Sequence, residues 1–423
     1  MSRDLSVFNV ARNGAGALTM EGVKLSDIAR EFGTPCYVYS EAALTTAFQR
    51  LDGALKSARG GRPYLICYAV KANSNLAILS LFAKLGAGFD IVSGGELRRV
   101  LAAGGDASSV VFSGLGKTAD EMAFALEAGI KCFNVESEPE LERLNSIAAR
   151  LGCKAPVSLR VNPDVDAKTH PYISTGLKNN KFGVAFERVR TVYARAAALQ
   201  NIAVTGVDCH IGSQLGDTAP LTEAMGKLVA LADELRNDGI PLHHVCPGGG
   251  IGIPYKDEAP IDLNAYAEAL QAALGDRDME LLLEPGRVLV GNAGVLLTRV
   301  EYVKTTPAKN FLVVDAAMND LIRPALYQAH HEVENAVPCD APPMACDVVG
   351  PVCESSDVLA YERTLSAREG DVLALLSAGA YGFVMASNYN TRNRAAEVLI
   401  RNGAPRVVRK RESFEDLIAH ERI

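Results

Sequence analysis

The sequence is short of paired cysteines. Its 423 residues include nine cysteines, yet no two of them form a Cys-x-x-Cys pair. Neither a zinc site nor a disulfide framework is therefore expected, and no metal is predicted. Reduced thiols are typical of cytoplasmic proteins. The N-terminal stretch also has no apolar core of signal-peptide length, so the predicted location is the cytoplasm.

Positive charge and long apolar runs are scarce as well. The formal net charge is −7 and the isoelectric point is near 5.6, which is unfavourable for nucleic-acid binding. A few local arginines could still hold a small anion. Residues 372–391 carry no charge, but serine, asparagine and glycine interrupt them. We expect a buried strand pair with a turn there, and no membrane span.

Two common motifs are missing. No Gly-x-Gly-x-x-Gly run opens a helix after a strand, so a dinucleotide site is not indicated. There is no Gly-x-Ser-x-Gly nucleophile elbow either. The content of 48% hydrophobic and 22% charged residues is typical of a globular enzyme, and the length favours two domains.

Eight apolar runs alternate with amphipathic helical segments through the middle of the chain. Such alternation is what a (β/α)8 barrel requires, so we predict a TIM-like barrel, with an open doubly wound sheet as the alternative. The expected strands are Tyr64–Val70, Phe89–Ser93, Val110–Ser113, Cys132–Val135, Val157–Val161, Gly206–His210, His243–Cys246 and Glu280–Leu283. The long polar insert 162–183 is a candidate active-site loop.

The pattern changes after Arg287, where short apolar runs are joined by loops that contain proline and glycine. Helices are expected there only at Asn319–Gln328 and Glu412–Glu421. We therefore predict an α/β protein with a barrel over residues 33–285. A second, mostly β domain would combine residues 286–423 with the N-terminal segment 1–32.

One lysine stands at the end of the first expected strand, in the segment Tyr-Ala-Val-Lys-Ala-Asn (68–73). Burial of its stem would lower the pKa of Lys71 and free the amine to attack a carbonyl group. Most lysines at strand ends are solvated, so this pattern is weak by itself. The motifs at the ends of the other expected strands strengthen the case for a catalytic lysine.

Polar motifs follow several strands at what would be the same mouth of the barrel. Three consecutive glycines, Gly248–Gly250, would let backbone N–H groups approach a phosphate, and Ser213 could add a hydroxyl. Glu284 could be a buried acid that faces a ring nitrogen, and His210 could be an aromatic platform. Each motif also has a purely structural interpretation. Together with the lysine, they indicate pyridoxal 5′-phosphate (PLP).

These motifs also resemble those of the diaminopimelate decarboxylases, PLP enzymes with an alanine-racemase-like fold. The matching segments are YAVKAN (68–73), HIGSQ (210–214), GGG (248–250), EPGR (284–287), CESSD (353–357) and GAYG (379–382). The resemblance extends from about Gly33 to Asn393. It implies decarboxylation of meso-2,6-diaminopimelate to L-lysine and CO2, the last step of lysine biosynthesis, by a homodimer with shared active sites.

The resemblance also implies roles for individual residues. Lys71 would bind the cofactor covalently, and Cys353 would be the acid near the reacting carbon, in the partner subunit's site. The remaining cofactor-binding residues would be Asp90, His210, Ser213, Gly249, Gly250, Glu284, Gly286, Arg287 and Tyr381. The substrate would be held by Arg287, Arg323, Tyr327, Glu354 and Tyr381.

Other functions stay open at this level. An ornithine- or arginine-type decarboxylase, an alanine-type racemase and a non-enzymatic PLP-carrying protein share the barrel. The β-rich residues 288–423 argue against a non-enzymatic PLP-carrying protein, because such a protein would have no use for them. Arg323 and Tyr327 are four residues apart, so a helix would place them on one face, where they could bind a distal carboxylate. The alternative is that Arg323 simply pairs with Glu354.

Overall fold

The computed structural model describes residues 4–165 and 181–423. The chain divides into two compact units. Unit 1 comprises residues 1–46, 253–258 and 289–423, and unit 2 comprises residues 47–252 and 259–288. Residues 166–180, which belong to the insert expected to form an active-site loop, lie outside the described residues.

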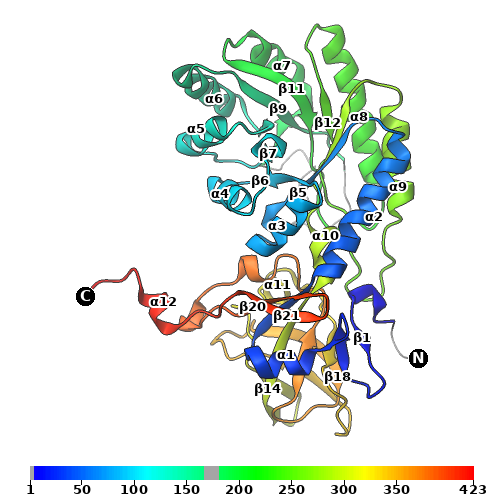
Figure 1. Cartoon of the computed structure of the whole chain (residues 1–423), viewed down its shortest axis with the longest axis vertical. Helices are drawn as coiled ribbons and strands as arrows, with labels where there is room; N and C mark the ends of the chain where they lie inside the picture. Colours follow the sequence, from blue (N-terminus) through cyan, green and yellow to red (C-terminus); the bar gives the residue numbers. More distant parts are fainter. Residues whose placement is uncertain (1–3, 166–180) are drawn as a thin grey trace. The chain divides into compact units, whose positions relative to one another are not determined.

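Unit 2 is a closed barrel of parallel strands with helices around it (Figure 1). Around the ring the strands are β5 (Tyr64–Ala69), β6 (Gly88–Ile91), β7 (Val110–Phe112), β8 (Cys132–Val135), β9 (Ala155–Asn162), β11 (Ile202–Asp208), β12 (His244–Cys246) and β13 (Glu280–Leu283). Because β13 pairs with β5 and β8 pairs with β9, the ring has no open edge. The predicted TIM-like barrel is confirmed, and the open doubly wound sheet is wrong.

Helices connect the barrel strands. They are α3 (Leu76–Lys84), α4 (Gly94–Ala102), α5 (Ala119–Ala128), α6 (Glu138–Leu151), α7 (Val189–Ala198), α8 (Ala219–Asn237) and α9 (Leu263–Leu274), and α2 (Glu41–Arg59) precedes the first strand. Thr118 and Glu121 form a capping box that starts α5, which satisfies backbone N–H groups at its first turn. Ser93 and Ser137 cap α4 and α6 in a similar way.

The first barrel strand ends one residue earlier than expected. Strand β5 stops at Ala69, and Val70–Ala72 form a 3-10 turn, so Lys71 lies in that turn and not on the strand. Residues 66–69 of this strand are all buried. A parallel strand that is covered on both faces usually has a continuous apolar sequence, which explains the apolar run seen here.

Unit 1 is mostly β-structure. It contains one large sheet and a small three-stranded meander near the N-terminus of the chain. The main sheet has the order β18 (Val358–Leu365), β17 (Met344–Val349), β15 (Asn310–Val314), β14 (Gly294–Thr305), β4 (Cys36–Ser40), β20 (Ala396–Arg401) and β21 (Ala404–Arg409). Strand β19 (Val372–Leu375) pairs with both β14 and β16 (Val333–Asn335). The meander consists of β1 (Ala11–Arg12), β2 (Leu18–Met20) and β3 (Val23–Lys24).

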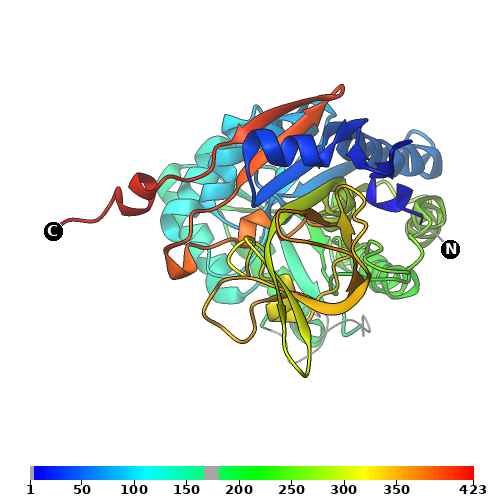
Figure 2. The ribbon, with the colours of Figure 1, turned by 90° about the horizontal axis from the view of Figure 1, so that it is seen from below.

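The N-terminal segment and the C-terminal part of the chain form one core. Strand β4 lies between β14 and β20, so the blue N-terminal ribbon runs beside the red strands (Figure 2). The expected N-terminal limit of this domain, residue 32, comes before β4. Helix α1 (Leu25–Phe32) buries Leu25 and Ile28 in the same hydrophobic cluster as Val38 and Val398 of this sheet. The predicted second, mostly β domain is confirmed.

Two local predictions in unit 1 were wrong. The strand pair expected within 372–391 is a single strand, β19, followed by the 3-10 turns η7 (Phe383–Met385) and η8 (Tyr389–Thr391). Ser377 and Tyr381 have φ angles of 56° and 55°, which a strand does not accommodate. The helix expected over 319–328 is shortened to α11 (Arg323–Tyr327), because Pro324 fits only its first turn.

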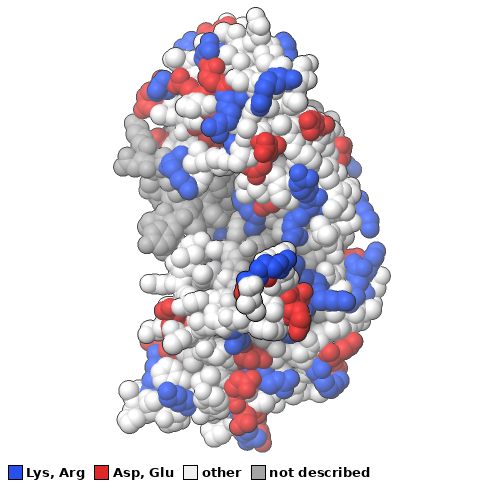
Figure 3. Space-filling view, turned by 90° about the vertical axis from the view of Figure 1, so that its left-hand side faces the viewer, with Lys and Arg blue, Asp and Glu red and all other residues white. Residues whose placement is uncertain are grey.

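The surface carries both signs of charge. On the face shown in Figure 3, lysine and arginine side chains are interspersed with aspartate and glutamate. Within the described residues, no helix combines the length and the apolar character that crossing a membrane requires. The last helix, α12 (Phe414–Ile418), begins at a capping box formed by Ser413 and Asp416, slightly later than expected.

Candidate active site

The expected nucleophile lies next to a buried acid. Lys71 Nζ is 2.6 Å from Oδ2 of Asp90. The two residues are brought together because β5 and β6 pair with Ala69 opposite Asp90. The Asp90 side chain is fully buried, whereas the Lys71 side chain is 36% exposed, so the lysine is less desolvated than expected. The Oδ1 atom of Asp90 is buried without a hydrogen-bond partner.

A second buried acid stands at the end of the eighth barrel strand. Glu284 follows β13 directly and is 6% exposed. Its Oε1 atom accepts a hydrogen bond of 2.9 Å from Nδ2 of Asn134, on β8. Burial, together with the negative charges of Asp208 and Asp90, raises the pKa of Glu284 well above its usual value. The side chain is therefore suited to share a proton with a ring nitrogen.

Two further polar groups crowd around Glu284. Asp208 and Cys246 end β11 and β12, and one polar atom from each of the three side chains lies within 4.8 Å of the others. Burial raises the pKa of Asp208 to about 7 and that of Cys246 well above its usual value. A metal ion would need these groups deprotonated, so they are better suited to hold protons.

The glycine run forms a cradle that side chains would fill. A Cβ atom on Gly249 would lie 2.0 Å from the backbone oxygen of Glu284, and one on Gly250 would lie 2.3 Å from that of Gly212. Gly250 also has a φ of 98°, which L side chains rarely adopt. The backbone N–H of Gly249 donates to Nδ1 of His210 at 3.3 Å.

His210 is half-buried after β11. Loss of hydration and the nearby cations Arg160 and Lys71 lower the pKa of His210 well below its usual value. Its ring is therefore neutral at pH 7. Because Nδ1 accepts the hydrogen bond from Gly249, Nε2 carries the ring hydrogen. A neutral ring at this place is suited to stack against an aromatic cofactor.

The loops after the sixth and eighth strands also meet. Arg287 Nη2 donates to Oγ of Ser213 at 3.1 Å. A Cβ atom on Gly286 would lie 3.1 Å from Cβ of Ala72, so this glycine packs against the turn that carries Lys71. The predicted barrel residues thus come together at the C-terminal ends of the strands, which is where TIM barrels place their active sites.

This set of groups fits PLP. A glycine cradle suits the phosphate, a buried acid suits the pyridine nitrogen, and a lysine amine can bond to the aldehyde carbon. The fit rests on a cradle that any side chain would block and on the buried Glu284 carboxyl group, whose raised pKa suits it to share a proton with a ring nitrogen.

The remaining predicted residues lie in unit 1. Arg323 starts α11 and is 6% exposed, and its guanidinium lies 4.6 Å from the centre of the Tyr255 ring. Its Nη1 atom donates to Nε2 of His331 at 2.7 Å, while His331 Nδ1 donates to the backbone oxygen of Leu376 at 2.8 Å. The Tyr255 ring and the His331 imidazole therefore both contact the Arg323 side chain. Tyr327 ends the same helix and is half-buried.

Cys353 and Glu354 are exposed and are held by the η8 turn. The Cys353 backbone N–H donates to Oδ1 of Asn390 at 2.9 Å, and the Tyr389 hydroxyl donates to Oε1 of Glu354. Tyr381 has a left-handed φ of 55°, a costly conformation that is often found at functional sites.

Strand-end reasoning missed several residues of this site. Asn134 is the penultimate residue of β8 and Asp208 is the last residue of β11, although Asp208 lies in the middle of the expected strand Gly206–His210, so a rule that looks only past the strand ends does not single them out. Tyr389 and Asn390 follow no such rule. Only the fold brings them to Cys353 and Glu354.

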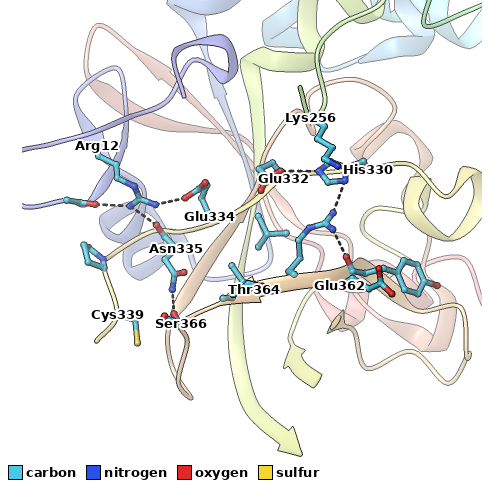
Figure 4. A pocket seen from close by; sticks show the side chains of 16 residues that line it. Arg12, Lys256, His330, Glu332, Glu334, Asn335, Cys339, Glu362, Thr364 and Ser366 are labelled. Atoms are coloured by element: carbon cyan, nitrogen blue, oxygen red, sulfur yellow. Dashed lines mark hydrogen bonds and ion pairs between the residues drawn. The ribbon is translucent and has the colours of Figure 1, made fainter. Parts of the chain in front are cut away.

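A separate groove of about 700 Å³ lies in unit 1 and includes none of the predicted site residues (Figure 4). Some of its polar groups pair with one another. Arg12 Nη2 lies 2.5 Å from Glu334, and His330 Nε2 lies 3.0 Å from Glu332. Its three basic residues (Arg12, Lys256 and Arg363) equal its three acidic residues (Glu332, Glu334 and Glu362) in number, so the groove offers no excess of either sign to a ligand.

Comparison with known proteins gives concordant results. Residues 42–291 match the family described as "Pyridoxal-dependent decarboxylase, pyridoxal binding domain". The chain is 59% identical over 404 residues to diaminopimelate decarboxylase of Pseudomonas aeruginosa, covering 96% of each chain. It is similar to the solved diaminopimelate decarboxylase of Helicobacter pylori complexed with L-lysine, at 44% identity and a TM-score of 0.90, covering 94% of this chain and 98% of that one. The M. jannaschii enzyme gives 40% identity and a TM-score of 0.94, covering 99% of each chain.

Proposed function

This chain belongs to the diaminopimelate decarboxylases, and we propose that it carries out their reaction at the C-terminal mouth of its barrel. The reaction is the PLP-dependent conversion of meso-2,6-diaminopimelate to L-lysine and CO2. The observation that carries the proposed site is the convergence of Lys71, Glu284 and the cradle at Gly249 and Gly250 on the ends of neighbouring strands.

Each barrel residue has a defined task in this proposal. When bound, PLP supplies an electron sink that accepts the electron pair left behind as CO2 departs. Lys71 would hold the cofactor through its amine, with Asp90 positioning that amine at 2.6 Å. Glu284 would hold the ring nitrogen and share its proton, while His210 would stack against the ring. Gly249, Gly250, Gly286 and Ser213 would hold the phosphate, with Arg287 positioning Ser213.

The substrate's distal end carries a carboxylate and an ammonium group. Arg323, Tyr327 and Arg287 would bind the carboxylate, since a guanidinium fork matches carboxylate geometry. Glu354 would bind the ammonium, and its link to the Tyr389 hydroxyl would orient it. Tyr381 would contact both cofactor and substrate. Cys353 or Lys71 would return a proton to the carbon that loses CO2.

We also propose that the enzyme is a homodimer in which Cys353 and Glu354 serve the partner's site. Both residues are exposed, which leaves them accessible to a second chain. Mixing inactive Lys71→Ala and Cys353→Ala chains would then restore part of the activity, because some mixed dimers contain one intact site. A mixture that stays inactive after verified subunit exchange would contradict sharing. We place the protein in the cytoplasm, in keeping with its nine free thiols.

One assay tests the reaction. Purified protein is incubated with PLP and meso-diaminopimelate, and lysine and CO2 are measured, with ornithine and lysine as alternative substrates. Equimolar lysine and CO2 from diaminopimelate alone is the expected result. Turnover of ornithine at a similar rate would instead favour a broad decarboxylase. Epimerisation without CO2 would favour a racemase.

A further inference from the structure

Glu284, which follows β13, is tied to β8 on the opposite side of the barrel by a single amide. Asn134 is 2% exposed in the barrel interior. Its Nδ2 atom donates to Oε1 of Glu284 at 2.9 Å and to Oγ of Ser113 at 3.0 Å. Both amide hydrogens are thus used. One of them fixes one oxygen of the Glu284 carboxyl group and leaves the other oxygen for a ligand.

The backbone and the side-chain amide of Asn134 are both held in place by neighbouring groups. Lys117, whose side chain is fully buried, donates from Nζ to the backbone oxygen of Asn134 at 2.9 Å. The same Nζ atom reaches the backbone oxygen of Gly114 at 2.6 Å and Oε1 of Glu140 at 2.7 Å. On the side-chain oxygen, Cys132 Sγ lies 3.8 Å from Asn134 Oδ1. The Lys117 contact holds the backbone of Asn134, whereas the Cys132 thiol at Oδ1 and the two acceptors at Nδ2 set which end of the amide faces Glu284.

The charges around Glu284 make this hydrogen bond important. Burial, Asp208 and Asp90 disfavour the ionised form of Glu284 and together raise its pKa, although the cations Lys71 and Arg160 act in the opposite direction. A donor aimed at a carboxylate oxygen acts in the opposite direction, because it stabilises the charged form. Asn134 therefore favours an ionised Glu284 through a direct hydrogen bond and without carrying a charge itself.

From this geometry we propose that Asn134 is a positioning residue for the cofactor ring. Its amide orients Glu284 and favours the carboxylate, so that the free carboxylate oxygen meets a protonated ring nitrogen. The inference rests on the proposed function in one respect, namely that Glu284 faces that nitrogen. It adds a residue that would act on the cofactor ring through Glu284.

Two phosphate probes isolate this effect without using catalysis. 4-Deoxypyridoxine 5′-phosphate has the ring nitrogen and the phosphate but no aldehyde, and benzyl phosphate has the phosphate alone. Their dissociation constants are measured by calorimetry for wild type, Asn134→Asp and Asn134→Leu. Asn134→Asp keeps the size of the side chain but removes the amide donor, and Asn134→Leu covers the case in which an added acid perturbs folding. Asn145→Asp on α6 is the matched control.

Both Asn134 variants should bind the pyridine probe about 10- to 100-fold more weakly, the fold-change expected for a hydrogen bond to a charged group. Benzyl phosphate should change less than twofold, and Asn145→Asp should match wild type with both probes. Equal weakening of both probes would mean a merely structural role and would overturn the inference, as would unchanged binding of the pyridine probe. A wild type that binds the pyridine probe but does not decarboxylate diaminopimelate would refute the proposed function only.

Discussion

Lys71 Nζ and Asp90 Oδ2 are 2.6 Å apart, and of the two side chains only that of Lys71 reaches solvent. Removing the lysine would leave a buried carboxylate without its cation. Lys71→Ala should lower the unfolding free energy of the cofactor-free protein by about 1–3 kcal/mol, less than for a fully buried pair because Lys71 is partly exposed. Urea titration measures this loss. Adding Asp90→Asn should recover most of it, and strictly additive losses would contradict the pairing.

The ring-nitrogen role of Glu284 predicts a large catalytic effect. Glu284→Gln keeps the shape of the side chain but cannot carry the negative charge that holds a protonated ring. We expect kcat for meso-diaminopimelate to fall about 10²-fold or more. Glu280→Gln is the matched control, since Glu280 starts the same strand and pairs with Lys131. Similar kcat values for the two variants would contradict the assignment.

Arg323 should determine substrate selectivity. Arg323→Ala should cost roughly 2–5 kcal/mol of transition-state binding, seen as a loss of most of kcat/KM for meso-diaminopimelate. Arg323→Lys should not restore it, because an ammonium cannot form the planar fork. Arg368→Ala, at an exposed surface pair with Asp340, should behave as wild type. The idea fails if Arg323→Ala stays near wild type.

Acid stability should depend on a carboxylate in the C-terminal segment. Glu412 accepts hydrogen bonds from Nε and the backbone N–H of Arg394 and from Nδ2 of Asn388. Burial alone would raise the pKa of Glu412, but these partners and the charge of Arg394 outweigh it and lower the pKa to about 2. A lowered folded-state pKa gives stability that is present above the unfolded value and is lost as pH falls through the folded value.

The unfolding free energy of wild type should therefore decrease between about pH 4.5 and pH 2, and that of Glu412→Gln should decrease less over the same range. Urea titrations at several pH values test this difference. Glu369→Gln serves as a control because Glu369 is an exposed acid in a loop of the same unit. Parallel pH profiles for wild type and Glu412→Gln would contradict the prediction.

The barrel could be predicted because its signals are local. Each buried strand is an apolar run, and chain topology alone brings Lys71, Glu284 and the glycines to one mouth. Asn134 could not be assigned a partner, since its amide meets a residue 150 positions away. The prediction of a strand near Tyr381 was wrong because Ser377 and Tyr381 have positive φ angles, which depend on packing and not on the hydropathy of the sequence. The Arg323–His331 link likewise depends on how unit 1 folds.

Identification of the lysine that holds the cofactor tests the central claim most directly. The PLP-loaded protein is reduced with borohydride and digested, and the modified peptide is sequenced by mass spectrometry. We predict one pyridoxyl group per chain, on Lys71. Modification of another lysine, such as the buried Lys117, or the absence of any modified lysine, would contradict the account.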